Sequence, residues 1–309
     1  MKAVICTKYG PPEVLKIAVL PKPVPGNKEV LIRIKATTAH IGDTKIRRLE
    51  PGLGRVKDFF FKPLMRFMVG FRGPRNKILG MELAGDIEAI GKDVTMFKPS
   101  DAVFATTEFS MGTYAEYRCM RESSMLALKS VNMTYEEAAP VSNAGITALV
   151  NLRKANIQKG QKVLIYGASG SVGIYAIQIA REMGAEVTAV CSTGNLQMVS
   201  ELGTVDVIDY TKTDFTESAA KYNVIFDAVG KIPRRKRKMA LVKGGFYLSS
   251  LAISGNVKLN ITDLNYLKEL CEAGKLRTVI DRVYKMDRVI EAHGYVDKGH
   301  KKGNVVLVW

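Results

Sequence analysis

The residues best suited to do chemistry in this sequence are the small residues that follow a short apolar strand at 163–166. They read Gly-Ala-Ser-Gly-Ser-Val-Gly and match the G-x-G-x-x-G turn of dinucleotide-binding proteins, with Ala168 in the first glycine position. Small residues let the backbone approach a pyrophosphate, and amides at the start of the next helix supply hydrogen-bond donors. The sequence therefore predicts a dinucleotide site at Gly167, Ala168, Ser169, Gly170, Ser171, Val172 and Gly173.

The type of dinucleotide is indicated by the end of the next strand, Val187–Cys191. Sites specific for NAD place an Asp or Glu about twenty residues past the glycine turn, where it binds the ribose 2′-hydroxyl. No acid stands between residues 189 and 195, where hydroxyl and amide groups suit a 2′-phosphate instead. We therefore expect NADPH in preference to NADH, bound through Ser192, Thr193 and Asn195.

The elements that must position these residues alternate between strand and helix patterns over residues 126–278. Further strands are expected at 205–209, 224–228 and 246–251, and further helices near 144–155, 215–221 and 233–241. A capping box, Thr134 with Glu137, starts an earlier helix. This order is typical of an α/β doubly wound parallel sheet, whose ligands bind at the carboxyl ends of the strands. Val229 and Gly230, after the fourth strand, are expected beside the ribose.

The sheet is expected to have a shortened edge after Leu251. A strand pattern at Val257–Ile261 follows Leu251 after only five residues, and the crossover between parallel strands needs about a dozen. The segment is therefore a hairpin, an irregular loop or a place where an element is missing. A helix over Asp263–Ala273 follows it.

Residues 1–125 show short strand patterns separated by Gly, Pro and Asn, which predicts a compact, mostly antiparallel barrel. Between the halves of this barrel, Arg47–Arg75 contains five phenylalanines among lysines and arginines. We interpret it as a helical or looped insertion over a cleft. The alternatives are an aromatic wall for a substrate and a contact with a partner or membrane surface.

Length and composition suit a two-domain globular protein. The 309 residues are 47% apolar, with no run long enough to span a membrane and no signal-peptide pattern, so we expect a cytoplasmic location. The four scattered cysteines are expected to be reduced. The net charge of +16 is spread along the chain. The densest basic run, residues 234–238, is interpreted as an exposed helix face, with nucleic-acid binding as the alternative.

Nearly the whole chain resembles the medium-chain dehydrogenase/reductase superfamily, and within it the zinc-independent quinone oxidoreductase branch. The stretches that carry the resemblance include MKAVICTKYGPPEVLKI, GMELAGDIEAIGKDVTMFKPSDAVF, MTYEEAAPVSNAGITAL, KVLIYGASGSVG, YNVIFDAVG and AHGYVDKGHKKGNVVL. The resemblance implies a GroES-like barrel from residues 1–125 and 279–309 and a Rossmann domain from residues 126–278. It also implies an active cleft between the two domains and subunits that pair at the altered sheet edge as a homodimer.

Zinc-dependent relatives carry a cysteine and a histidine where this sequence has His40 and Met81. Methionine is a poor ligand for zinc, although His40, Asp43 and Glu82 could nominally supply three ligands, so no metal is expected. His40, Asp43 and Met81 are instead expected to line the substrate cleft, with His40 as a polar contact or a proton donor. By the resemblance, Thr147 lies near the nicotinamide and Tyr210 near the adenosine ribose and its phosphate.

Two functions are therefore weighed. The first is an enzyme that transfers a hydride from NADPH to a quinone, enone or related carbonyl, a small-molecule substrate. The alternative is an NADPH-binding regulatory or nucleic-acid-binding protein with weak or lost turnover. The basic run and the short join after Leu251 motivate this alternative.

Overall fold

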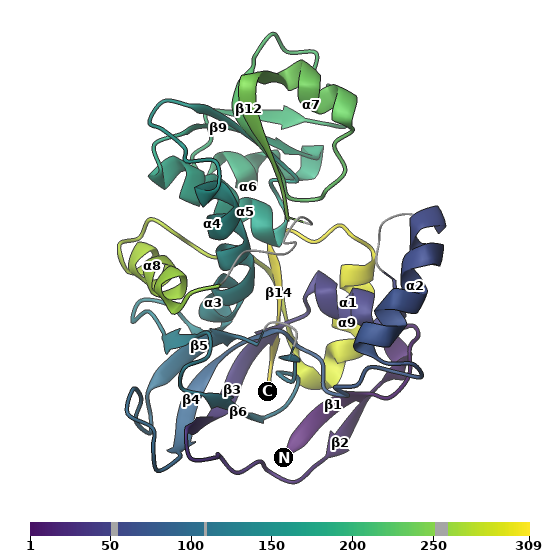
Figure 1. Cartoon of the computed structure of the whole chain (residues 1–309), viewed down its shortest axis with the longest axis vertical. Coiled ribbons are helices and arrows are strands. Elements are labelled where there is room, and N and C mark those ends of the chain that lie inside the picture. The colour runs from purple at the N-terminus through teal and green to yellow at the C-terminus, as the bar shows by residue number, and fades with distance from the viewer. Residues whose placement is uncertain (51–54, 108–109, 251–258) are drawn as a thin grey trace. The chain divides into compact units, whose positions relative to one another are not determined.

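The computed structural model describes residues 1–50, 55–107, 110–250 and 259–309, without the side chains of residues 55–58. The chain forms two compact units (Figure 1). The first unit comprises Met1–Asn143 and Ile280–Trp309, and the second comprises Ala144–Val279. Residues 126–143, which the sequence analysis assigned to the Rossmann domain, thus belong to the first unit.

The second unit is built on a five-stranded parallel sheet, as the strand and helix alternation predicts. Its strand order is β10-β9-β8-β11-β12, so the order reverses at β8, and β8 pairs with both β9 and β11. In an open α/β sheet such a reversal is where ligands bind. The strands are β8 (Lys162–Tyr166), β9 (Glu186–Cys191), β10 (Asp206–Asp209), β11 (Tyr222–Asp227) and β12 (Leu241–Ser249).

The helix that matters most in this unit is α5 (Ser171–Glu182), which follows the glycine turn. Every residue from Gly173 to Ala180 is buried, because α5 packs against β8 and β9 and also against α4 (Ile146–Arg153). The helix predicted over 215–221 is wrong, since this segment forms turns. Asp214 starts these turns by accepting hydrogen bonds from the amide and the hydroxyl of Thr216, which is an Asx turn.

The remaining helices of the second unit are α6 (Leu196–Ser200), α7 (Arg234–Ala240) and α8 (Ile261–Glu272). Residues 257 and 258 of the predicted strand at 257–261 lie outside the described residues. Its described part, 259–261, is not a strand, because Asn260 is the N-cap of α8 and Ile261 begins this helix. The sheet edge after Leu251 likewise lies outside the described residues. Among those described, β12 is the last strand of the sheet.

The first unit is organised around β3 (Glu29–Thr38), which pairs antiparallel with three other strands. These are β4 (Glu82–Ile90), β6 (Tyr117–Arg121) and β14 (Asn304–Val308). β5 (Ala102–Thr106) and β7 (Leu126–Leu128) extend the sheet on one side and β13 (Ile280–Lys285) extends it on the other. β1 (Lys2–Cys6) and β2 (Leu15–Val19) form a separate pair. The mostly antiparallel architecture expected for the N-terminal part is confirmed.

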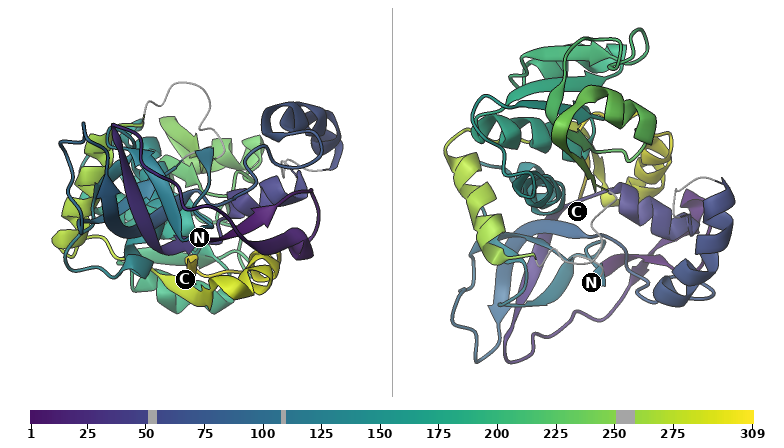
Figure 2. Two further views of the ribbon diagram at one scale, coloured as in Figure 1. Left: turned by 90° about the horizontal axis from the view of Figure 1, so that it is seen from below. Right: turned by 45° about the horizontal axis from the view of Figure 1, so that its top comes forward.

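The described part of the first unit contains four α-helices. They are α1 (Ile41–Arg48), α2 (Arg55–Val69), α3 (Tyr135–Pro140) and α9 (Val289–Asp297). The predicted capping box of Thr134 and Glu137 starts α3. The Arg47–Arg75 insertion is helical over α2, which is seen from two further directions in Figure 2, and irregular over 70–75. Among the described residues, no helix is both long and apolar enough to cross a membrane.

Candidate functional site

The predicted glycine turn links β8 to α5, and its geometry demands glycine at two positions. Gly167 has a φ of +78°, and a Cβ there would lie 2.3 Å from Cγ2 of Val229. A Cβ on Gly173 would lie 2.3 Å from the carbonyl oxygen of Gly167. The first contact shows that the ends of β8 and β11 meet at this turn. The second fixes the close approach of α5 to the turn.

The start of α5 presents backbone to the outside of the turn. Its N-cap is Gly170, which supplies no side-chain cap, and a Cβ on Gly170 would meet only the Gly167 oxygen, at 3.5 Å. A helix N-terminus concentrates amide donors and the positive end of the helix dipole. The turn therefore fits the pyrophosphate of a dinucleotide, as the sequence predicts.

The structure brings the residues after β9 together with the glycine turn. Nδ2 of Asn195 donates to Oγ of Ser192 at 2.9 Å and to Oγ of Ser169 at 3.3 Å. Oδ1 of Asn195 is buried and has no hydrogen-bond partner within the described parts of the chain. Rotating this amide by about 180° would turn its NH2 group to that side. A ligand with acceptor or donor groups would satisfy the amide in either orientation.

An acid that the sequence analysis missed lies beside these residues. β9 and β10 are parallel, and their register places Asp209 opposite Cys191. The Asp209 carboxylate accepts hydrogen bonds from the Thr193 hydroxyl at 2.6 Å and from the hydroxyl and amide of Thr211 at 2.7 and 3.0 Å. The Thr193 and Thr211 hydrogen bonds lower the pKa of Asp209. Only the pairing of neighbouring strand ends reveals this acid, since it is distant along the chain.

Tyr210 and Lys212 line a small pocket of about 200 Å³ next to these strand ends. Tyr210 is exposed, and the pocket continues to Tyr166, Phe215 and Lys236. Lys236 pairs with Asp214 at its rim. The predicted contact residue Tyr210 thus lies in a concave, partly cationic surface.

Val229 and Gly230 form a tight turn after β11. Both amides donate to Oδ1 of Asp227, at 3.1 and 2.7 Å, and the Ile232 amide donates to Oδ2 at 2.7 Å. Asp227 is fully buried, so its role is to shape this turn. The Val229 side chain lies against Gly167 of the glycine turn. Thr147, the remaining predicted cofactor contact, is half-buried on α4.

In the first unit, His40 is the N-cap of α1. Its Nδ1 accepts a hydrogen bond from the Gly42 amide at 3.0 Å, so a neutral ring carries its proton on Nε2. Burial, together with the charges of Lys301 and Lys45, lowers the pKa of His40 to about 4. At neutral pH His40 can therefore donate a hydrogen bond through Nε2 without being an imidazolium acid.

His40 and Met81 both lie beside Gly42, whereas Asp43 is enclosed and does not line a cleft as was expected of it. A Cβ on Gly42 would lie 2.9 Å from His40 Nδ1 and 3.1 Å from Met81 Sδ, which places both side chains around Gly42. Asp43 is fully buried, and its oxygens accept from the Gly80 amide at 2.9 Å and from the Tyr114 hydroxyl at 3.4 Å. Asp43 therefore positions the segments that carry His40 and Met81.

These residues are a poor fit for a zinc ion. His40 Nδ1 and both Asp43 oxygens already accept hydrogen bonds, and the Met81 thioether is a weak ligand. Within the described ranges, no group of three or more His, Cys, Asp or Glu side chains could hold a metal.

A buried polar network behind α1 was missed by the sequence analysis. Tyr114 bonds to Nε2 of His293 at 2.9 Å, and Nε of Arg47 donates to Nδ1 of His293 at 3.2 Å. Arg47 is fully buried and pairs with Asp297. Burial first, and then Arg47, lower the pKa of His293 to about 3. The neutral ring therefore links α9 to α1 and to Asp43.

Glu82 and Lys301 form a second missed feature near His40. Glu82 is buried and accepts a hydrogen bond from Thr38. Burial raises the pKa of Glu82 to about 8 and lowers that of Lys301 to about 8. Both groups therefore titrate close to neutral pH. Glu82 and Lys301 are far apart in the sequence, so the sequence does not show that each acts on the pKa of the other.

Comparison with known proteins matches two family descriptions. Residues 26–130 match "Alcohol dehydrogenase GroES-like domain" and residues 232–307 match "Zinc-binding dehydrogenase". The chain is 30% identical to 2-methylene-furan-3-one reductase of Solanum lycopersicum, over 99% of this chain and 79% of the relative. It is also 30% identical to quinone-oxidoreductase QR1, chloroplastic, of Triphysaria versicolor, over 99% of this chain and 98% of the relative.

A solved structure is also similar to this chain over its full length. The quinone oxidoreductase from Coxiella burnetii superposes with a TM-score of 0.81 at 27% identity, over 100% of this chain and 99% of that one. The similarity therefore extends over both units.

Proposed function

Because the chain belongs to the medium-chain dehydrogenase/reductase superfamily, we propose that it is a zinc-independent oxidoreductase acting on quinones, enones or related carbonyls. NADPH would supply the hydride. The observation that supports this most directly is the turn at Gly167–Gly173, whose backbone fits a dinucleotide pyrophosphate. Relatives named as quinone and alkenal/one oxidoreductases support the substrate class.

The preference for NADPH rests on the polar groups after β9. Ser192, Thr193 and Asn195 offer hydroxyl and amide groups to a 2′-phosphate, and Lys212 adds a cation nearby. Asp209 opposes this preference, because a carboxylate repels a phosphate. Its three hydrogen bonds from Thr193 and Thr211 spread that charge.

On the acceptor side, His40 would bind the carbonyl oxygen through Nε2–H and so stabilise the negative charge that hydride addition creates. Reduction of a quinone to a hydroquinone consumes one hydride and one proton. We propose Lys301, whose charge acts on His40 and whose pKa burial lowers to about 8, as the source of that proton. Asp43 holds the loop that carries Met81.

The test is oxidation of NADPH, and separately NADH, followed at its absorbance with a panel of quinones and enones. We expect turnover with at least one acceptor, faster with NADPH, in protein whose zinc content is far below one per chain. Tight NADPH binding without turnover on any acceptor would contradict an enzymatic role. Stoichiometric zinc would contradict the metal-free mechanism.

The alternative, a nucleic-acid-binding protein, rests on the basic run of α7, part of which has structural partners. Lys236 pairs with Asp214, and Arg237 lies 3.6 Å over the ring of Tyr247 while donating to the Ile232 carbonyl oxygen at 2.7 Å. These contacts favour a structural role for two of the five residues of the run. Salt-sensitive binding of single-stranded RNA, competed by NADPH, would reinstate the alternative. A cytoplasmic location and a homodimer stay predictions.

A further inference from the structure

One face of α2 forms an apolar stripe. Phe61, Leu64, Met65, Met68 and Val69 follow the spacing i, i+3, i+4, i+7 and i+8, which places them on one side of a helix. Met65 and Val69 pack against the core of the first unit. Phe61, Leu64 and Met68 are 46%, 52% and 68% exposed. Two residues of the stripe thus pack against the core, and the other three are largely exposed.

The same stripe forms one wall of a cavity of about 510 Å³, which lies wholly within the first unit. Cavities of this size are typical of sites for small organic ligands. The other apolar residues that line the cavity are Ile46 of α1, Pro74 and Met111. Three of the apolar lining residues are methionines, whose flexible side chains adapt to ligands of varied shape.

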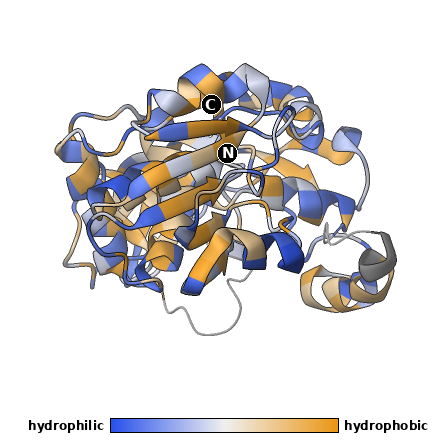
Figure 3. Cartoon of the chain, turned by 90° about the horizontal axis from the view of Figure 1, so that it is seen from above, coloured by the Kyte–Doolittle hydropathy of each residue, from blue (hydrophilic) through white to orange (hydrophobic). Residues whose placement is uncertain are grey.

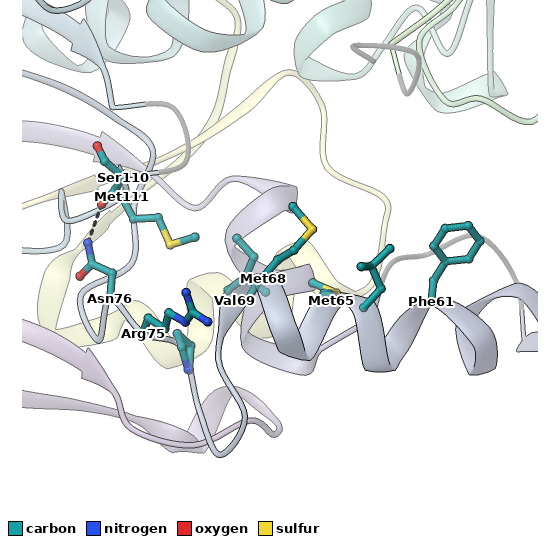
Figure 4. Close-up of a pocket in the computed structure, with 11 residues that line it drawn as sticks. Phe61, Met65, Met68, Val69, Arg75, Asn76, Ser110 and Met111 are labelled. Carbon is teal, nitrogen blue, oxygen red and sulfur yellow. Dashed lines mark hydrogen bonds between the residues drawn. The ribbon is translucent and has the colours of Figure 1, made fainter. Parts of the chain in front are cut away.

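The cavity has a polar end and an apolar end (Figure 4). Arg75, Asn76 and Ser110 lie at one end, where Asn76 Nδ2 donates to the Ser110 carbonyl oxygen. Phe61 lies at the other end, beyond Met68, Val69 and Met65. From Val69 to Phe61 the helix rises eight residues at about 1.5 Å each, or about 12 Å. A ligand that matches this lining has a polar head and an extended apolar chain.

The polar end is tied to the segment that carries Met81. The Gly112 amide donates to the Leu79 carbonyl oxygen at 3.2 Å, and the Thr107 amide donates to that of Met81 at 2.7 Å. Ile46, in the cavity wall, belongs to α1, whose N-cap is His40. The head of a bound ligand would therefore lie on the side of the cavity that leads toward His40 and Met81.

We propose that this cavity, the α2 pocket, binds the alkyl or prenyl chain of an elongated quinone or enone acceptor, with the carbonyl-bearing head at the Arg75–Asn76–Ser110 end. The inference rests on the proposed reductase function and narrows its substrate class from any quinone or enone to those with an apolar chain. Apolar and basic residues both occur along α2 (Figure 3), but the chain-binding role uses only the stripe.

The test compares two quinones with the same dimethoxy-methyl ring, one bearing a decyl chain and one bearing none. Binding to the full-length protein is measured by calorimetry without NADPH, and KM is measured in the NADPH oxidation assay. We expect the decyl quinone to bind about tenfold or more tightly than the unsubstituted one, with one site per chain.

Met68→Trp fills the α2 pocket, and we expect it to abolish the higher affinity of the decyl quinone over the unsubstituted quinone. Phe60→Trp is the matched control, since Phe60 is an exposed apolar residue of the same helix that does not line the pocket. Leu64→Trp repeats the test from a second position of the stripe. Thermal melting of each variant is measured as the control for correct folding.

Equal affinity for the two quinones, or an equal loss in the Phe60→Trp control, would overturn the proposal. The first result would show that no chain is bound, and the second would show adsorption to exposed phenylalanines. If neither quinone oxidises NADPH but the decyl quinone still binds in a Met68-dependent way, the reductase function fails while the pocket stands. If both quinones turn over with no dependence on the chain, the reductase function stands while the pocket fails.

Discussion

Two helices of this protein begin just after a strand, and they begin in opposite ways. α5 starts at Gly170, which has no side-chain cap, after a turn that excludes side chains at Gly167 and Gly173. α1 starts at His40, whose ring accepts a hydrogen bond from the Gly42 amide and so caps the helix. The amides at the start of α5 are available to an anionic ligand, whereas at the start of α1 the Gly42 amide is bonded to the His40 side chain.

The difference shows how the two units divide the proposed chemistry. The second unit would recognise phosphate with backbone, so its site depends on the absence of side chains. The first unit would present a neutral ring and a thioether to an uncharged acceptor. A polar network, Asp43–Tyr114–His293–Arg47, holds α1, the helix that His40 caps, against α9. Substitutions in each unit test whether the two sites differ in this way.

Gly173→Ala should break the α5 site. The added methyl would lie 2.3 Å from the Gly167 oxygen and 2.8 Å from Ala168 backbone atoms, so the turn must move. We expect NADPH affinity to fall by about a hundredfold, or about 2.7 kcal/mol, in a fluorescence titration. Gly294→Ala is the matched control, because a Cβ at Gly294 meets nothing within 4 Å. Unchanged affinity in Gly173→Ala would refute the cofactor role of this turn.

His293→Gln should change how stability depends on pH. The folded-state pKa of about 3 lies below the ordinary 6.5, so the unfolded chain binds a proton that the folded chain does not. This proton removes stability as pH falls from about 6.5 toward 3, at up to about 1.4 kcal/mol per pH unit. The variant should lose that slope in urea unfolding experiments.

Asp43 and Glu82 act in the opposite direction. Their pKa values are raised to about 7 and about 8, so the folded state holds their protons and loses stability as pH rises toward those values. The His293 contribution is therefore obtained as the difference between wild type and His293→Gln at each pH. Identical slopes in the two proteins would show that His293 is not buried as a neutral ring.

His40→Ala should weaken both the cap and the acceptor contact. Loss of an N-cap costs about 1 kcal/mol of unfolding free energy. Loss of the Nε2 donor should lower kcat/KM about tenfold. His40→Asn keeps a capping oxygen and should retain the stability of the wild type. If His40→Ala matches wild type in both stability and kcat/KM, the capped site has neither role.

Asp209→Asn should sharpen cofactor choice by the smallest amount. Removing the carboxylate beside Thr193 removes repulsion of a 2′-phosphate, so the NADPH-to-NADH ratio of kcat/KM should rise by about threefold. Asp206→Asn, at the exposed start of the same strand, is the control. A fall in the ratio would show that Asp209 orients Thr193 toward the phosphate rather than repelling it.

Much of this arrangement is predictable from the sequence because it is local. The glycine turn, the parallel sheet around it and the capping box at Thr134 follow from residue types at short spacing. Local backbone geometry depends on nearby residues, so a short window contains the information. The helix expected over 215–221 fails for a related reason, since a side chain of Asp214 competes for the backbone.

The tertiary structure alone decided the electrostatics and the cavity. Asp209 lies beside Thr193 because β9 and β10 pair. Asp43 does not line the expected cleft, because the Gly80 amide and Tyr114 enclose it. His293 reaches Arg47 across 246 positions of sequence. Burial sets the pKa values of these groups, and burial depends on which distant segments pack together. The sequence by itself thus determined a glycine turn suited to a dinucleotide, while packing determined the charges beside it and the apolar cavity under α2.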